Sequence, residues 1–265
     1  MALTYDAVSV DLPWSRTTKS RTVIAASSQQ ETVLVSKGLD GEGLQSWIRE
    51  HASHAGLVLL DVPIDGCDGL CRGVPRRAVD DRLARIGIPI LPSYKSGDLG
   101  PNLRDALRDA RPDLSVLEGY PYAVLRALWG ISQEVGPPVL TASNYSVNVS
   151  PWRTWWHWPP RYKRARTVAQ RRHALAQVAD LLRSCGEGYA RLVRAPALGT
   201  SRELAQLSDE YDAVLGLIAA DSALQKNPWS WQAQAPGARG SILTIGPPWL
   251  RDAFAALTDS GGHGG

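Results

Sequence analysis

One uninterrupted apolar run, GLVLLD at residues 56–61, constrains the fold of this chain most. A strand with apolar side chains on both faces is typical of the inside of a layered α/β domain. The run ends at Asp61, and ligands of open α/β sheets bind in the crevice beyond the carboxyl ends of strands. Asp61 is therefore a candidate functional residue. The alternative is that Asp61 caps the turn before Pro63, which is ordinary turn chemistry.

An antiparallel meander is predicted before this strand. Residues 4–11 alternate apolar and polar positions and end at Asp11, and two short β-type runs follow at residues 21–26 and 31–35. A helix over residues 41–53 then leads to the buried strand. Three antiparallel strands, a crossover helix and a buried strand indicate an α/β rather than an all-β domain.

The middle of the chain contains a third strand that ends in a carboxylate. Residues 65–111 are punctuated by glycine, proline and charge, so we expect a long, partly irregular insert with helices at 78–86 and 102–110. Residues 114–118 then form a predicted strand that ends at Glu118. Three predicted strands thus end in an acidic side chain.

A late amphipathic helix over residues 202–222 adds further carboxylates. Asp212 lies beside alanine and glycine, which let a helix approach a sheet closely and leave room for an ion; the alternative is a purely structural position. Asp209 projects from nearly the same side, whereas Glu210 points away and is expected to be solvated. Beyond this helix, residues 241–245 are predicted to form an edge strand.

Carboxylates that are brought together repel one another unless they are protonated or bridged by a cation. Hard oxygen donors select Mg²⁺ or Mn²⁺, and two such ions about 3.5 to 4 Å apart can promote phosphodiester cleavage. Other chemistries are less well supplied, because the sequence has no G-x-S-x-G elbow, no Walker A loop and no G-x-G-x-x-G after a strand. His51 and His54 are expected at the surface. The sequence therefore predicts a shared metal site.

The chain of 265 residues, 44% of them hydrophobic, is long enough for one large core. We expect a single domain over residues 1–258 and a flexible tail at 259–265. The N-terminus lacks a secretory pattern, and no apolar run reaches the roughly 18 residues of a membrane span, so we expect a soluble, cytoplasmic protein. Three cysteines in a chain of this length are interpreted as free thiols.

Positive charge is concentrated in a tryptophan-rich segment, residues 151–194. Ten Lys or Arg residues stand there against two acids, a net charge of +8, and the rest of the chain sums to −5. We predict a basic helix over residues 161–184. Aromatic side chains beside arginines can stack bases and neutralise phosphates. The candidate nucleic-acid contacts are Trp152, Arg153, Trp156, Arg161, Lys163, Arg164, Arg171 and Arg172. The alternative is that the tryptophans pack a lid or a partner surface and the arginines line a solvated helix face.

The order of four short motifs resembles the DUF429 family of predicted nucleases, which belongs to the ribonuclease H-like superfamily. The motifs are VSVD at 8–11, LDVP at 60–63, LEGYPYA at 117–123 and DEYDA at 209–213. Tyr162-Lys163, with Arg171-Arg172 downstream, also resembles the helical region before the family's last motif. The likeness spans about residues 4–222.

The resemblance implies a ribonuclease H-like fold, in which a five-stranded mixed sheet of three antiparallel and two parallel strands is flanked by helices. It also implies that Asp11, Asp61, Glu118 and Asp212 line the metal site, with Asp209 as an addition. One departure is that Asp11 is followed by Leu-Pro-Trp, where relatives commonly have glycine.

We expect a divalent-metal-dependent nuclease or phosphodiesterase that uses Mg²⁺ or Mn²⁺ and acts on DNA or RNA. Two alternatives stay open: a phosphoryl-transfer enzyme of the same superfamily, and an inactive module that binds nucleic acid or protein. The turn after Asp11 speaks against phosphoryl transfer, because it lacks the glycine that lets a backbone approach phosphate.

Overall fold

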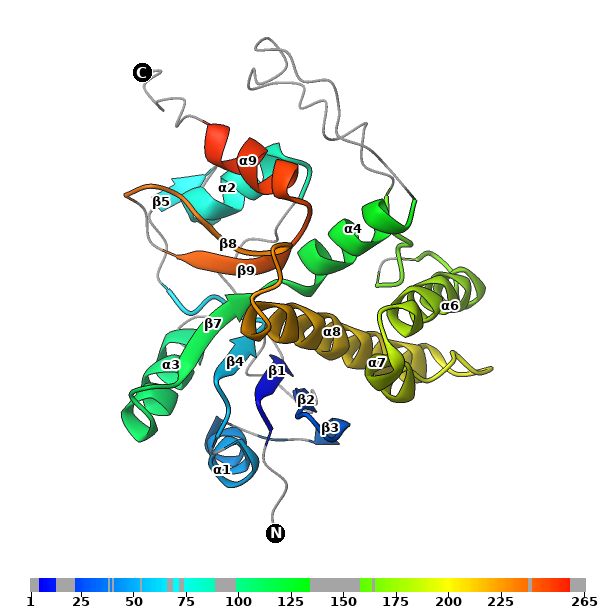
Figure 1. Cartoon of the computed structure of the whole chain (residues 1–265). Coiled ribbons are helices and arrows are strands. Elements are labelled where there is room, and N and C mark those ends of the chain that lie inside the picture. The colour runs from blue at the N-terminus through cyan, green and yellow to red at the C-terminus, as the bar shows by residue number, and fades with distance from the viewer. Residues whose placement is uncertain are drawn as a thin grey trace.

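The computed structural model shows an α/β architecture built on a seven-stranded mixed sheet (Figure 1). The structure describes residues 5–12, 22–37, 39, 41–52, 54–65, 69–71, 74–88, 99–133, 158–163, 165–237 and 240–257. The strands lie in the order β3 (Thr32–Lys37), β2 (Thr22–Ser27), β1 (Ala7–Asp11), β4 (Leu57–Leu60), β7 (Ser115–Gly119), β9 (Ser241–Ile245) and β8 (Ser230–Gln234).

The predicted meander is confirmed, but the predicted number of strands is wrong. β1, β2 and β3 pair antiparallel, and β4 and β7 follow in parallel. β9 then adds parallel to β7 and β8 adds antiparallel to β9, so the sheet has seven strands rather than five. The predicted edge strand at 241–245 is consequently an inner strand. Its neighbour β8 was not predicted, because the exposed polar side chains of Gln232 and Gln234 interrupt its apolar residues.

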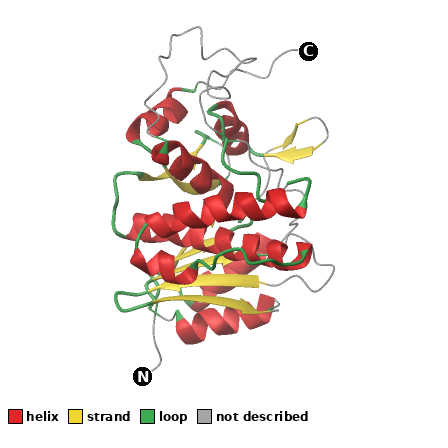
Figure 2. Ribbon diagram, turned by 90° about the vertical axis from the view of Figure 1, so that its right-hand side faces the viewer, coloured by secondary structure: helices red, strands yellow, loops and turns green. Residues whose placement is uncertain are grey.

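Helices cover both faces of the sheet, as Figure 2 shows. On one face, Ala7, Leu57 and Leu59 pack against a group of four helices. These are α4 (Pro121–Ser132), α6 (Val168–Ser184), α7 (Glu187–Leu192) and α8 (Ser201–Leu224). On the other face, Val8 and Val58 pack against α1 (Gly41–His51) and α3 (Leu99–Ala110). Successive residues of β1 and β4 thus alternate between the two cores, as a strand buried on both sides requires.

A third apolar cluster lies over the β8–β9 end of the sheet. There α2 (Ala78–Arg85) and α9 (Pro248–Ala256) pack on Trp231 and Ile242, at the top of Figure 1. A small hairpin, β5 (Gly69–Cys71) and β6 (Val74–Arg76), precedes α2. The described part of the predicted insert therefore contains a hairpin as well as the two expected helices. Among the described helices, none combines the length and the apolar character that crossing a membrane would require.

The basic helix begins later than predicted. α6 starts at Val168 rather than at residue 161, because the Thr167 side chain caps it by accepting a hydrogen bond from the Gln170 backbone N–H. Residues 158–163 lie outside any helix. They pass beside α8, where the Tyr162 side chain is buried in the core.

Close contact between α8 and β1 depends on a glycine. A Cβ atom at Gly216 would lie 2.1 Å from Ser9 Oγ and 3.2 Å from Ser9 Cβ, so with any other residue the Ser9 side chain would have to turn and the helix would have to move slightly outward. Gly216 is one turn beyond Asp212, and Ser9 is two residues before Asp11 on the same face of β1. The expectation that small residues beside Asp212 allow a close approach is confirmed at this position.

Replacement of this glycine is expected to destabilise the fold. In Gly216→Ala the new methyl group collides with Ser9, and overpacking of this kind costs about 1–3 kcal/mol. Urea denaturation of wild type, Gly216→Ala, Ser9→Ala and the double variant gives the coupling energy. Alanine gains about 1 kcal/mol of helix propensity over glycine, which offsets part of this cost. We expect Ser9→Ala to recover part of the loss, and a Gly216→Ala protein more stable than wild type by about 1 kcal/mol would contradict the packing argument.

Candidate metal centre

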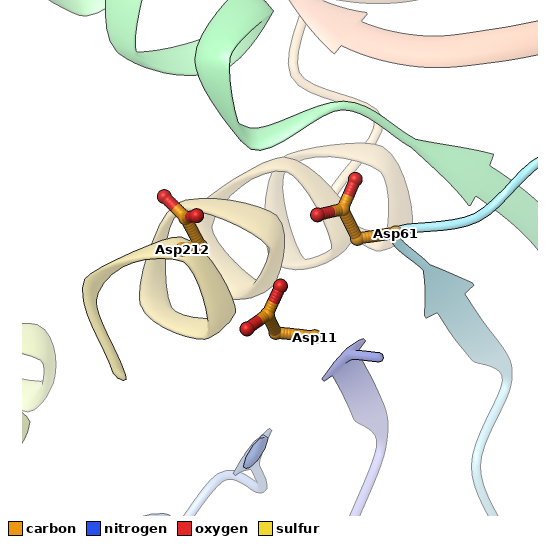
Figure 3. Close-up of side chains that lie close together, drawn as sticks. All are labelled: Asp11, Asp61 and Asp212. Carbon is orange, nitrogen blue, oxygen red and sulfur yellow. The ribbon is translucent and has the colours of Figure 1, made fainter. Parts of the chain in front are cut away.

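Three aspartates from distant parts of the chain converge at one edge of the sheet (Figure 3). Asp11 ends β1, Asp61 directly follows β4 and Asp212 lies in the middle of α8. Each offers a carboxylate oxygen, and these three atoms all lie within 4.8 Å of one another. The structure thus brings together three of the four principal predicted ligands.

Strand register places Asp11 beside Asp61. β1 and β4 are parallel with Val10 opposite Leu60, and the Asp61 N–H donates to the Val10 carbonyl oxygen at 3.0 Å. The two aspartates are the next residues along and extend the alternating positions that face α8. Their carboxylates therefore meet Asp212 on the helix side of the sheet.

Asp212 is held by two consecutive residues of the segment before α6. The Tyr162 hydroxyl donates to Asp212 Oδ1, and Lys163 Nζ forms an ion pair with Oδ2. The Asp212 residue is 2% exposed, whereas the Lys163 side chain is 46% exposed. Lys163 was predicted to contact nucleic acid, but in the structure it belongs to the carboxylate cluster. Tyr162 was not predicted as a site residue, although the Tyr162-Lys163 pair was the available signal.

Burial and neighbouring charges shift the pKa values of Asp11, Asp61 and Lys163 in the cluster. Burial, reinforced by the Asp212 charge, raises the pKa of Asp11 well above its ordinary value. Burial also raises the pKa of Asp61, against the opposing effect of Lys163. For Lys163, burial lowers the pKa, but the carboxylates of Asp212, Asp11 and Asp61 more than reverse this and raise it. The ammonium group therefore stays charged and acts as a local counterion.

Glu118, the fourth predicted ligand, occupies different surroundings. It lies opposite Leu60 in the β4–β7 register, and Leu60 faces the core on the α1 and α3 side. The alternation of strand side chains therefore places Glu118 on the other face from Asp61. The Ile64 backbone N–H donates to Glu118 Oε2 at 3.2 Å. Among the described carboxylates, the group within 4.8 Å does not include Glu118.

Arg77, which the sequence analysis did not single out, binds Glu118 through both carboxylate oxygens. The two N–H···O distances are 2.5 and 2.6 Å, and the same guanidinium donates to Asp80 at 2.7 Å. All three side chains are almost fully buried. Burial raises the pKa of Glu118 to about 7, although Arg77 acts in the opposite direction. No sequence signal links Arg77 to a residue 41 positions away.

The neighbours of Asp212 on α8 differ from the expectations. Asp209 is half-buried and outside the 4.8 Å group, and burial raises its pKa to about 6 while Lys163 lowers it. Glu210 was expected to be solvated, which is wrong. It is 8% exposed and pairs with Arg194 at 2.6 Å, because a residue of the loop before α8 folds over it.

The predicted nucleic-acid contacts are only partly described. Arg161 is exposed, and Arg171 and Arg172 are partly buried on α6. Arg171 donates to Ser208 Oγ on α8 at 3.3 Å, so this helix face is partly structural. Trp152, Arg153, Trp156 and Arg164 lie outside the described residues.

The donor set of the cluster fits a hard divalent cation. Three buried carboxylates supply only oxygen, as Mg²⁺ and Mn²⁺ prefer, and an ammonium already balances part of their charge. Comparisons with protein-family models, with curated proteins and with solved structures gave no match. The interpretation of the site therefore rests on its geometry and on the sequence motifs.

The metal-free protein is expected to lose stability as the pH rises. Because burial raises the pKa values of Asp11 and Asp61, the folded state binds more protons than the unfolded state above the ordinary aspartate pKa of about 4. Below about pH 4 these two groups contribute their full share to the free energy of unfolding. That share is lost as the pH rises through their raised pKa values. Thermal unfolding in chelator between pH 5 and pH 8 measures this.

The double variant Asp11→Asn/Asp61→Asn is the control for this prediction, since its amides do not titrate. Its melting temperature should depend less on pH than that of wild type. Equal pH dependence in the two proteins would show that the carboxylate pair does not carry the effect.

Proposed function

We propose that the protein is a divalent-metal-dependent nuclease or phosphodiesterase that hydrolyses nucleic acid with Mg²⁺ or Mn²⁺. The observation that carries the proposal is the convergence of Asp11, Asp61 and Asp212, whose carboxylate oxygens lie within 4.8 Å of one another. Buried acids at such spacing are costly without a cation. A bound metal ion removes this cost and gives the cluster a chemical use.

The topology of the sheet supports the same proposal. The strands β3-β2-β1-β4-β7 comprise three antiparallel and two parallel strands, as the resemblance to the DUF429 family implies. Asp11 and Asp61 then lie at the carboxyl ends of neighbouring parallel strands, where α/β proteins bind ligands. The strands β9 and β8 extend this arrangement without changing its centre.

Each residue of the cluster has a role in this mechanism. Asp11, Asp61 and Asp212 would hold the cation, which supplies Lewis acidity and activates water when bound. The Tyr162 hydroxyl and the Lys163 ammonium fix the orientation of the Asp212 carboxylate. The Lys163 side chain is also 46% exposed, so its charge is available to an incoming phosphate.

Positive charge around the cluster supports a polyanionic substrate. The segment 151–194 carries a net charge of +8, and its described residues lead directly into the cluster through Lys163. Arg161 and Arg166 are exposed on either side of Lys163 in the sequence, and Trp158 is 48% exposed, with the Arg126 guanidinium over its ring at 4.0 Å. Such a surface suits a phosphodiester backbone with stacked bases.

Loss of two ligands is expected to abolish metal binding and cleavage together. We predict that metal-free wild type binds Mn²⁺ in calorimetry and cleaves labelled DNA or RNA when Mg²⁺ or Mn²⁺ is added. Asp61→Asn/Asp212→Asn should lose both properties. Asp65→Asn is the matched control, because Asp65 pairs with Arg104 at 2.6 Å instead of joining the described carboxylate cluster. Cleavage by the folded double variant would refute the proposal.

Two further assays, of salt-dependent nucleic-acid binding and of ATP turnover, test the alternative functions. Salt-sensitive binding of nucleic acid without metal-dependent cleavage favours a binding module. Turnover of ATP without cleavage of nucleic acid favours phosphoryl transfer.

The exposed arginines that flank Lys163 in the sequence are expected to contact the substrate backbone. In the inactive Asp61→Asn/Asp212→Asn background, Arg161→Ala/Arg166→Ala should weaken nucleic-acid binding and reduce the salt slope of log K by about 1 per lost phosphate contact. Arg251→Ala, an exposed arginine on α9, removes a charge elsewhere and should leave the slope unchanged. Fluorescence anisotropy at several salt concentrations measures both. Equal slopes in all three proteins would exclude these arginines from the interface.

A further inference from the structure

The acidic groups around the centre differ in the cations that already accompany them. Glu118 has Arg77, and Asp209 lies in the fields of Lys163 and Arg171. The three clustered aspartates have only the Lys163 ammonium among the described side chains that form ion pairs with them. Three carboxylates and one ammonium leave a formal charge of −2 once ionised. One divalent cation neutralises that charge.

Glu118 is committed to the protein and is poorly placed to supply a second ion. Both of its oxygens accept hydrogen bonds from Arg77, and Oε2 also accepts the Ile64 N–H. Its side chain is 4% exposed and belongs to the opposite face of the sheet from Asp61. Recruiting it to a metal would leave the buried Arg77 with Asp80 as its remaining carboxylate partner, and breaking a buried ion pair is costly.

Lys163 occupies a cation position within the cluster itself. Its ammonium pairs with Asp212 Oδ2 and lies in the fields of Asp11 and Asp61. The neighbouring Tyr162 hydroxyl binds the other oxygen of Asp212, so consecutive residues hold the carboxylate from both sides. A carboxylate oxygen has more than one lone-pair direction, so Asp212 can bind a metal while it keeps these contacts.

We propose that the centre binds one divalent cation, held by Asp11, Asp61 and Asp212, with the Lys163 ammonium in place of a second metal ion and Glu118 outside the ligand set. This inference rests on the proposed function, because it presumes that the cluster binds a metal. It assigns Glu118 a positioning role. Through Arg77 and Ile64, Glu118 ties the segment that follows Asp61 to β7 and to the start of α2.

Titration of the metal-free full chain with Mn²⁺ tests the number of ions. We expect calorimetry to give one ion per chain and electron paramagnetic resonance to show the spectrum of an isolated Mn²⁺. Two ions with an exchange-coupled spectrum would overturn this inference while leaving the proposed function in place. Absence of Mn²⁺ binding would overturn the proposed function itself.

Variants of Lys163 and of Glu118 test the two parts of the inference separately. Lys163→Met should bind Mn²⁺ about tenfold more tightly or better, because a positive charge beside the ion is removed. Lys226→Met, which removes an exposed lysine just beyond the end of α8, is the matched control and should bind like wild type. Unchanged or weaker binding by Lys163→Met would refute the role of Lys163.

Glu118→Gln should keep the affinity of wild type within about threefold, since its amide oxygen can still accept the Ile64 N–H and the inference places Glu118 outside the ligand set. Circular dichroism shows whether this variant folds. A folded variant that loses Mn²⁺ binding would identify Glu118 as a ligand and overturn the inference. If the variant does not fold, the wild-type spectrum and stoichiometry still decide.

Discussion

The contact of α8 with the sheet determines where the functional groups of this protein can meet. Gly216 lets the helix lie directly on Ser9 of β1, and one turn earlier Asp212 reaches the level of Asp11. The same helix packs over Leu59 of β4, the strand that leads to Asp61. A side chain at this contact would press against Ser9 of β1. The position of the carboxylate cluster is therefore a property of the main core as much as of the acids.

Two groups of buried charged side chains lie near the carboxyl end of β4, and their charges are paired to different extents. Arg77, Asp80 and Glu118 satisfy one another in a nearly inaccessible position and join the insert to the sheet. Asp11, Asp61, Asp212 and Lys163 leave an excess of negative charge beside a half-exposed ammonium. A satisfied network stabilises a single arrangement, whereas an unbalanced one favours binding of a cation. This difference distinguishes Glu118, which is paired with Arg77, from Asp61, which lies in the unbalanced cluster at the end of the neighbouring strand.

The sequence was sufficient for the central strands and for the three aspartates that the structure brings together. An apolar run that ends in an acid predicts both β4 and the position of Asp61, and the alanine and glycine around Asp212 predict a close helix. The face occupied by Glu118 could not be predicted, because it depends on the pairing register of β4 with β7. The partners of Arg77 and Lys163 could not be predicted for a related reason. These partners are distant in the sequence, and charge composition does not specify which acid a cation will meet.

The order of the elements along the chain has a consequence for biosynthesis. Asp11 of β1 is translated before Asp212 and the helix that covers β1, which follow the insert and the basic segment. The inner strand β9, which pairs with β7, is made later still. Asp11 therefore cannot meet Asp212 until α8 has been translated, and contacts between segments so distant in the sequence are slow to form. The carboxylate cluster thus depends on a long-range contact that can form only after both of its strand ends have been made.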